Sequence, residues 1–372
     1  MELSSRIDPV LSVARESARE VDSTPRFPSE AVEALRASGL LGLTLPEEVG
    51  GLGGGPPELV QVLSALASAC GSTAMIYLMH VSAAMTVAAG PPEDWAEMLP
   101  SLADGRALGT LAFSEAGSRS HFWAPVSRAD RNGDGVHVKA RKSWVTSAGH
   151  ADVYVTTTGN ADTEGGVDVY AFPADTPGLA VAGQFHGLGL RGNASCPMTF
   201  EVPNASTYTV GAPGGGFDIL LGTVMPWFNL GNAAVSLGFA QAVTDAAVSH
   251  TSAARLEHLD QSLSALPTIR AQLAKMSIDL AATRAYVDQA AARIAAPADD
   301  TVLHVLGVKA AANDAALRIT DTAMRVCGGA AFSEHLQIDR YFRDARAGYV
   351  MAPTADVLYD FYGKAITGQP LF

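Results

Sequence analysis

Two parts of the chain, residues 1–106 and 214–372, place apolar residues at the three- to four-residue spacing of α-helices. Within 269–294 the apolar positions mark one face of a long helix. A further helix is expected over 302–329, where two consecutive glycines favour the left-handed turn that ends a helix. Several long helices in series predict an antiparallel four-helix bundle.

Residues 107–213 change to the two-residue alternation of β-strands. The short segments VHVKARKSWV, DVYVTTTG, VDVYAFP and MTFEVP are rich in β-branched residues and are separated by turn sequences such as NGDG. They predict an antiparallel β-barrel domain. The predicted fold class is therefore α+β, with an N-terminal α-helical domain (1–106), a middle β-domain (107–213) and a C-terminal helical bundle (214–372).

Residues 59–91 contain no charged residue apart from His80 and are long enough to suggest a membrane span. However, Gly71, Ser72 and Thr73 divide the run into two segments of ordinary globular length. We therefore expect a buried helix pair and no membrane association.

Charge and cysteine content exclude several classes of function. A net charge of −13 leaves no electrostatic footprint for nucleic acid. Cys70, Cys196 and Cys327 are too scattered for a disulfide framework or a metal site, and no His/Cys cluster exists, so no metal is expected. The N-terminus shows no apolar signal-peptide core, and a cytoplasmic location is expected.

The segment GLGLRG (187–192) matches the dinucleotide pattern G-x-G-x-x-G. That pattern binds a pyrophosphate only where a helix begins directly after it. Here an alternating strand, CPMTFEVP, follows. We therefore expect a turn between strands.

Six segments in order resemble the acyl-CoA dehydrogenase superfamily: RFPSEAVEALRASGLLGLTLPEEVGGLG, LGTLAFSEAGSRSH, KARKSWVTSAGHADVYV, GLGLRGNASCPMTFEVP, MRVCGGAAF and IDRYFRDAR. The resemblance covers nearly the whole chain. It implies FAD held without a covalent bond between the β-domain and the bundle, in a homo-oligomer (dimer or tetramer). It also implies an acyl thioester substrate, on CoA or acyl carrier protein, and an electron-transfer flavoprotein or a flavin reductase as redox partner.

Carried over position by position, the resemblance places Phe113 and Ser114 against the flavin ring, with Trp144 and Thr146 beside it. Ser120 falls near the cofactor pyrophosphate. A flavin that is reduced to an anion needs such hydrogen-bond donors and an apolar wall.

Other implied contacts come from the bundle. Arg255 matches an arginine that reaches the FAD of a partner subunit, and Arg325 replaces the usual glutamine in MRVCGG, which keeps Gly328 and Gly329. Thr354 matches the family threonine that contacts the cofactor.

Bulky residues occupy the loop after the first predicted β-strand. Arg119 stands where glycine is usual, and it either binds a phosphate, reshapes the pocket or is a solvated surface arginine. His121 and Phe122 are expected to line the substrate pocket, together with Tyr349.

The family's catalytic glutamate is missing, because Ala352 stands at its position. A minority of the family carries that glutamate in the stretch that corresponds to 219–238, which contains no acidic residue. Three explanations stay open. Another residue serves as base, with Asp356 and His80 as candidates; or the enzyme is a monooxygenase of the same fold that uses reduced flavin, bound or as co-substrate, and O₂; or it is a catalytically weak flavin-binding homologue. A flavin-free binding module is the remaining class.

Overall fold

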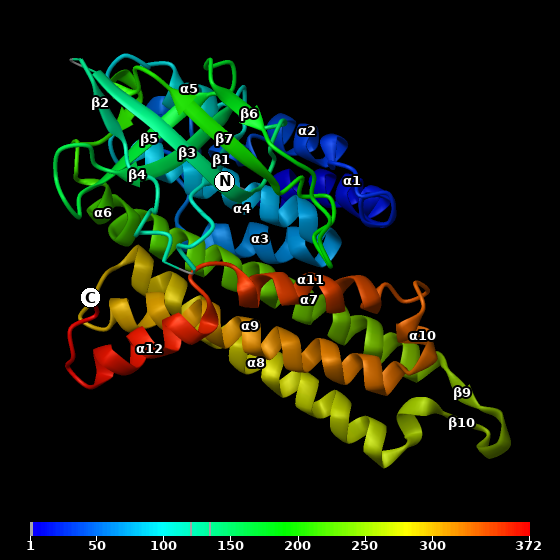
Figure 1. Cartoon of the computed structure of the whole chain (residues 1–372). Helices are drawn as coiled ribbons and strands as arrows, with labels where there is room; N and C mark the ends of the chain where they lie inside the picture. The colour runs from blue at the N-terminus through cyan, green and yellow to red at the C-terminus, as the bar shows by residue number, and fades with distance from the viewer. Residues whose placement is uncertain (1–2, 120, 134) are drawn as a thin grey trace.

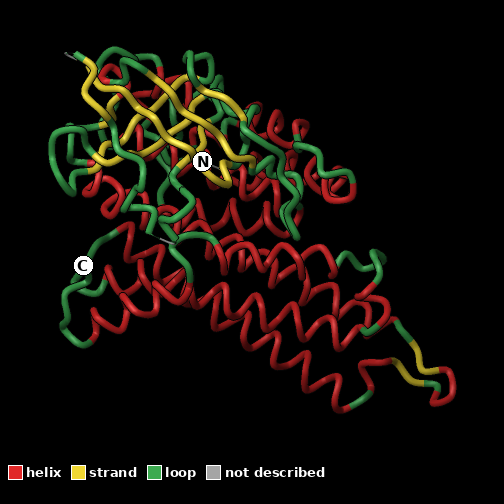
Figure 2. The backbone as a smooth tube through the Cα atoms, viewed as in Figure 1, coloured by secondary structure: helices red, strands yellow, loops and turns green. Residues whose placement is uncertain are grey.

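Helices form both ends of the chain and strands form its middle (Figure 1). The structure is a computed structural model that describes residues 3–119, 121–133 and 135–372. The order of helical, β and helical parts confirms the predicted α+β fold class. In Figure 2 most strands lie together in the upper part of the view, with long helices beneath them.

The N-terminal part is helical. Its elements are α1 (Leu3–Ser23), α2 (Ser29–Ser38), η1 (Leu40–Gly42), η2 (Glu47–Val49), α3 (Pro56–Ala69), α4 (Gly71–Ala88) and α5 (Met98–Ala103). Gly39, at φ 73°, ends α2 in the left-handed conformation. Within the described residues, α4 alone is long and apolar enough to cross a membrane, yet 83% of it is buried inside the fold, where it packs against α3, α7 and β1. This burial confirms the predicted core helix pair.

The middle part consists of two four-stranded sheets, ordered β1-β4-β5-β8 and β2-β3-β7-β6. Their elements are β1 (Gly109–Ala112), β2 (Asp130–Asn132), β3 (Gly135–Val145), β4 (Val153–Gly159), β5 (Val167–Pro173), β6 (Leu179–Val181), β7 (Cys196–Val202), η3 (Ser206–Tyr208) and β8 (Thr209–Val210). One pairing departs from the predicted antiparallel arrangement, because β1 pairs with β4 in parallel. The chain between them crosses to the other sheet and returns in the same direction.

The C-terminal part is a helical bundle in which α7 packs on α8, α9 and α11. Its elements are α6 (Gly216–Ile219), the π-helical turn η4 (Leu220–Val224), α7 (Met225–Ala253), β9 (Arg255–Leu256), η5 (Glu257–Leu259), β10 (Gln261–Ser262), η6 (Leu263–Ala265), α8 (Pro267–Ala295), α9 (Thr301–Cys327), α10 (Gly329–Phe332), α11 (Ile338–Val350) and α12 (Ala355–Ile366). As predicted, α9 ends at the glycine pair, with Gly328 at φ 55°.

The GLGLRG segment forms the loop between β6 and β7, which confirms the predicted turn between strands. Gly189 is required for its packing rather than for a phosphate. A Cβ atom at this position would lie only 2.6 Å from the carbonyl carbon of Arg343 in α11. The loop backbone therefore lies directly against the helix.

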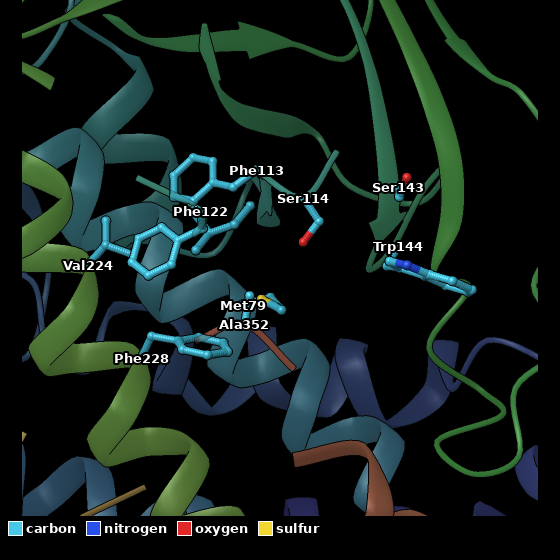
Figure 3. Close-up of a pocket in the computed structure, with 10 residues that line it drawn as sticks. Met79, Phe113, Ser114, Phe122, Ser143, Trp144, Val224, Phe228 and Ala352 are labelled. Atoms are coloured by element: carbon cyan, nitrogen blue, oxygen red, sulfur yellow. The ribbon is translucent and has the colours of Figure 1, made fainter. Parts of the chain in front are cut away.

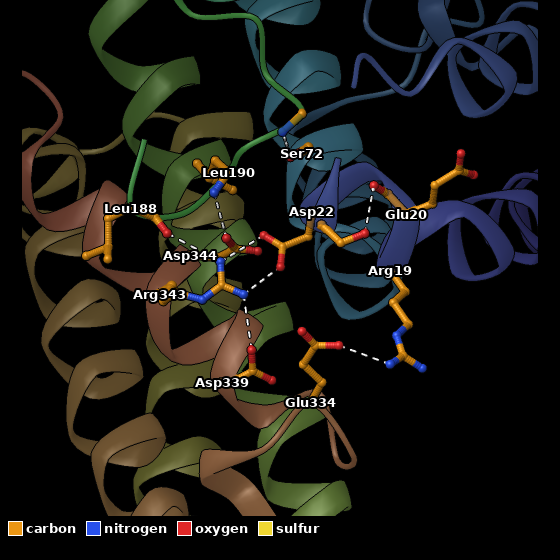
Figure 4. A network of polar contacts seen from close by, with 12 residues as sticks. Arg19, Glu20, Asp22, Ser72, Leu188, Leu190, Glu334, Asp339, Arg343 and Asp344 are labelled. Atoms are coloured by element: carbon orange, nitrogen blue, oxygen red, sulfur yellow. Dashed lines mark hydrogen bonds and ion pairs between the residues drawn. The ribbon is translucent and has the colours of Figure 1, made fainter. Parts of the chain in front are cut away.

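Polar contacts connect this loop to the helices (Figure 4). Asp344 of α11 is buried and accepts a hydrogen bond from the backbone N–H of Leu190 at 2.6 Å. The neighbouring Arg343 forms a two-bond ion pair with Asp22 of α1 and donates to the carbonyl of Leu188. The loop is thus held between the first and the penultimate long helix of the chain.

The Asp344 contact predicts a pH-dependent stability. Burial raises the pKa of Asp344 to about 6, although the Leu190 N–H and Arg340 oppose this shift. A folded-state pKa above the ordinary value means that the contribution to stability is present at low pH and is lost as pH rises through about 6. Asp344→Asn keeps an acceptor for Leu190. We expect its free energy of unfolding to rise by about 1–3 kcal/mol relative to that of the parent as the pH is raised from about 4.5 to about 7.5.

Urea unfolding at a series of pH values measures this difference. The control is Asp288→Asn, which removes a carboxylate from an exposed position of α8. A pH-independent difference for Asp344→Asn would contradict the prediction.

Candidate functional site

Two adjoining cavities lie where the β-domain meets the helices, and Figure 3 draws residues that line the smaller one. The larger has a volume of about 680 Å³ and the smaller about 60 Å³. The larger falls within the usual range for cofactor sites. The residues shared by both linings are Met79, Ser114, Phe122, Trp144, Phe228 and Ala352.

The indole of Trp144 forms one wall of both cavities because β3 bulges at this point. The pairing of β3 with β7 shifts register between Lys142 and Val145. Trp144 takes the left-handed conformation, with φ 56°, which is rare for a bulky residue. The side chain leaves the sheet and 67% of its surface is exposed beside the cavity. Such backbone strain is typical of functional sites.

A buried ion pair supports this bulge. Lys142 lies 2.9 Å from Glu115, and both side chains are almost completely buried. Lys142 also donates to the carbonyl of Thr157 at 2.6 Å, while Glu115 accepts from the backbone N–H of Ser127 at 3.0 Å. Burial raises the pKa of Glu115, but Lys142 and Ser127 outweigh it and hold that pKa below its usual range. Glu115 therefore stays ionised, and its oxygens are engaged by Lys142 and Ser127.

The structure brings four of the predicted flavin contacts to the larger cavity: Ser114, Trp144, Thr146 and Thr354. Phe113 lines the smaller cavity, and Ser120 lies outside the described residues. In Figure 3 the Ser114 hydroxyl lies between the phenylalanine rings and the indole.

Two further polar residues of the larger cavity, Asn193 and Ser195, were not predicted from the sequence. Ser195 Oγ lies 3.2 Å from Thr146 Oγ1. Asn193 Oδ1 is buried and accepts no hydrogen bond from any described residue. A buried acceptor without a partner indicates a ligand that brings a donor. An isoalloxazine ring offers an N–H group and a flat apolar surface, so the cavity fits FAD.

Ala352 lines both cavities and offers no proton acceptor. Among the described residues of the two linings, Glu115 is the one carboxylate, and its oxygens are engaged as above. Neither cavity therefore presents a free carboxylate.

A buried lysine holds the segment around Ala352 in place. Nζ of Lys309 in α9 donates to the carbonyls of Gly348 at 2.9 Å, Met351 at 3.0 Å and Pro353 at 2.8 Å. Burial lowers the pKa of Lys309 to about 7. Because all three N–H donors are used, the segment between α11 and α12 has a defined path past the cavity.

The two candidate bases are not at the cavities, and these predictions are corrected. His80 is buried, with Nε2 2.9 Å from the carbonyl of Leu41 and Nδ1 accepting the N–H of Gly109 at 3.0 Å. Burial lowers its pKa to about 4, so it is a neutral core residue. Asp356 is exposed in the first turn of α12, where a carboxylate complements the helix dipole.

Of the predicted substrate-pocket residues, Phe122 lines both cavities and stacks on Phe113 at 6.1 Å. His121 is exposed and meets the edge of Trp123 at 5.2 Å, so it is not part of either lining. Tyr349 also lies outside both linings, and Asp356 raises its pKa. Adjacent side chains point in different directions here, and only Phe122 turns inward.

The predicted partner contacts lie in β9 and where α9 meets α10, at the end of the bundle away from α12 (Figure 1). Arg255 in β9 pairs with Asp260. Arg325 is exposed near the end of α9, beside exposed Gly328 and Gly329. Their contact with a partner's FAD stays a prediction.

Comparison with known proteins identifies the family. Residues 10–106, 110–202 and 214–367 match the family models for the N-terminal, middle and C-terminal domains of acyl-CoA dehydrogenase. A probable acyl-CoA dehydrogenase, YngJ of Bacillus subtilis, is 29% identical, covering 91% of this chain and 90% of its own.

Solved structures share the fold. Butyryl-CoA dehydrogenase from Megasphaera elsdenii superposes with a TM-score of 0.90 at 24% identity, covering 99% of both chains. An FAD complex of PigA has a TM-score of 0.90 at 17% identity, covering 98% of this chain and 97% of its own. Together with the family models, these likenesses show that the chain belongs to the acyl-CoA dehydrogenase family and is a flavoenzyme.

Proposed function

We propose that the protein is an FAD-dependent oxidoreductase that acts on an acyl thioester of CoA or acyl carrier protein. The proposed reaction is desaturation of a carbon–carbon bond with a non-standard or absent base. The observation that carries the proposal is the larger cavity, which joins the Trp144 indole and the Ser114 and Thr146 hydroxyls to an alanine at the usual base position.

Bound FAD would supply a hydride acceptor. The chain's residues would provide the environment for it. The Trp144 indole offers a flat face, and Ser114 and Thr146 offer hydroxyl donors. On the Ala352 side, Met79 and Phe228 form an apolar wall that excludes water.

The missing carboxylate limits the rate of desaturation. An α-proton beside a thioester is weakly acidic, and a positioned base contributes roughly 10²- to 10⁴-fold to its removal. Because Ala352 accepts no proton and Glu115 is engaged, we expect slow turnover of saturated acyl thioesters. A flavin-binding homologue with little activity is the limiting case.

The lack of a free carboxylate also favours a second candidate, a monooxygenase that uses reduced flavin and O₂. The smaller cavity is lined mainly by apolar side chains, including Phe113, Phe122 and Val224, and such a lining keeps water from a reactive centre. A dehydrogenase would pass electrons to an electron-transfer flavoprotein, whereas a monooxygenase would need a flavin reductase.

We further propose a dimer or tetramer in a reducing cytoplasm. Arg255, Gly328 and Gly329 are exposed at one end of the bundle, where a partner's cofactor could reach them. The three cysteines are free thiols in the described structure.

The first prediction concerns flavin binding. Trp144→Ala should weaken FAD by about 1–2 kcal/mol, or roughly five- to thirty-fold, because a stacking surface is lost. Trp144→Phe keeps a ring and should lose less. Equilibrium titration followed by flavin fluorescence measures both variants, and equal affinity for the parent and Trp144→Ala would contradict the proposed wall.

The second prediction separates the two reactions. Under anaerobic conditions, a dehydrogenase should bleach its flavin slowly when a panel of saturated acyl thioesters is added. No bleaching, combined with productive O₂ consumption by the reduced enzyme, would instead identify the monooxygenase. Stopped-flow absorbance at the flavin bands records the bleaching, and an oxygen electrode records the O₂ consumption.

Substituting Ala352 with glutamate would restore the missing base. Ala352→Glu should raise desaturation of butyryl-CoA by roughly 10²- to 10⁴-fold. Ala352→Gln, of similar volume but without a charge, is the matched control and should give no increase. If both variants bind FAD and both stay inactive, the pocket does not admit acyl thioesters.

A further inference from the structure

The lining of the larger cavity carries an excess of positive charge. Three arginines belong to its lining: Arg119 in the loop after β1, and Arg343 and Arg346 in α11. Arg343 is neutralised, because it pairs with Asp22 at 2.5 Å and Asp339 at 3.1 Å. This pairing leaves the positive charges of Arg119 and Arg346 to be explained.

No carboxylate among the described residues lies within 4 Å of the guanidinium groups of Arg119 or Arg346. The acidic residue of the lining, Glu115, is already balanced by Lys142. The lining thus has two uncompensated positive charges, although the whole chain has a net charge of −13.

Arg346 is held in place by neutral groups. Its Nη1 donates to Thr320 Oγ1 at 3.2 Å and to the carbonyl of Phe342, and its guanidinium lies over the Phe342 ring. Burial lowers its pKa, although Asp321 opposes this shift. A half-buried charge with no carboxylate within 4 Å among the described residues is costly unless a ligand supplies the opposite charge. The side chain is therefore oriented before any ligand arrives.

We propose that Arg346, together with Arg119, forms a phosphate-binding site in the lining of the larger cavity. Two uncompensated cations match a phosphate dianion better than a single carboxylate, and the guanidinium fork suits phosphate oxygens. The site differs from the contact implied for Arg255, because it lies on the chain that forms the flavin wall.

This inference rests on the proposed flavin site, and the phosphate has two possible sources. One is the pyrophosphate of FAD, and the other is a phosphate of the carrier that bears the acyl thioester. Both sources present the same chemistry to the arginines. FAD and the acyl thioester are therefore tested in separate arms, each against a ligand without phosphate.

The experiment compares Arg346→Met with the parent, with Arg346→Lys as the charge-retaining variant. Arg15→Met removes one charge from an exposed position of α1 outside both linings and is the matched control. In the first arm, cofactor-free protein is titrated with FAD and with riboflavin, which has no phosphate. In the second arm, FAD-loaded protein is titrated with butyryl-CoA and with the butyryl thioester of N-acetylcysteamine, which also has no phosphate.

We expect Arg346→Met to lower the affinity for the phosphate-bearing ligand of one arm roughly tenfold or more, with the affinity for the phosphate-free ligand unchanged. Arg346→Lys should retain part of the affinity, and Arg15→Met should match the parent. A selective loss of affinity for FAD identifies the dinucleotide as the source of the phosphate. A selective loss of affinity for butyryl-CoA identifies the carrier.

Equal loss for ligands with and without phosphate, or no loss in either arm, overturns the inference. If the parent binds FAD and Arg346→Met binds it and butyryl-CoA equally well, the inference alone fails. If the parent binds neither FAD nor a thioester, the proposed function fails as well.

Discussion

The ion pair between Lys142 and Glu115 determines the shape of the cofactor cavity. Removing two charges from water is expensive, and breaking such a pair costs about 3–5 kcal/mol because the remaining charge is buried alone. Here the partners come from β3 and from the loop after β1, and both also bond to backbone groups. Since β3 bulges directly after Lys142, the pair fixes the point at which Trp144 leaves the sheet.

A second buried lysine has the corresponding role on the opposite side of the cavity. Lys309 gives all three of its donors to backbone carbonyls around Ala352, and so determines the path of a segment that has no regular structure. The cavity thus has one wall set by a charge pair in the β-domain and one set by a lysine in the bundle. What the walls enclose is a space suited to a flavin, with no free proton acceptor beside it.

The sequence predicted features that depend on local geometry. Gly39 and Gly328 end helices at a positive φ, which glycine adopts because it has no Cβ atom. The parallel pairing of β1 with β4 was missed because alternation in a short strand specifies its buried face but not its partner. His80 was mistaken for a candidate base because sequence does not show that both ring nitrogens are bonded to the backbone. Asn193 was not predicted because the sequence does not show that its amide oxygen is buried without a hydrogen-bond donor.

A crystal structure of the protein grown with FAD would show whether a flavin ring lies against Trp144 with no carboxylate at the Ala352 side. We expect isoalloxazine density beside the indole and Ser114, with no Asp or Glu oxygen close enough to the ring face at Ala352 to accept a substrate proton. A ring bound elsewhere, or an acidic side chain turned into that space, would contradict this expectation.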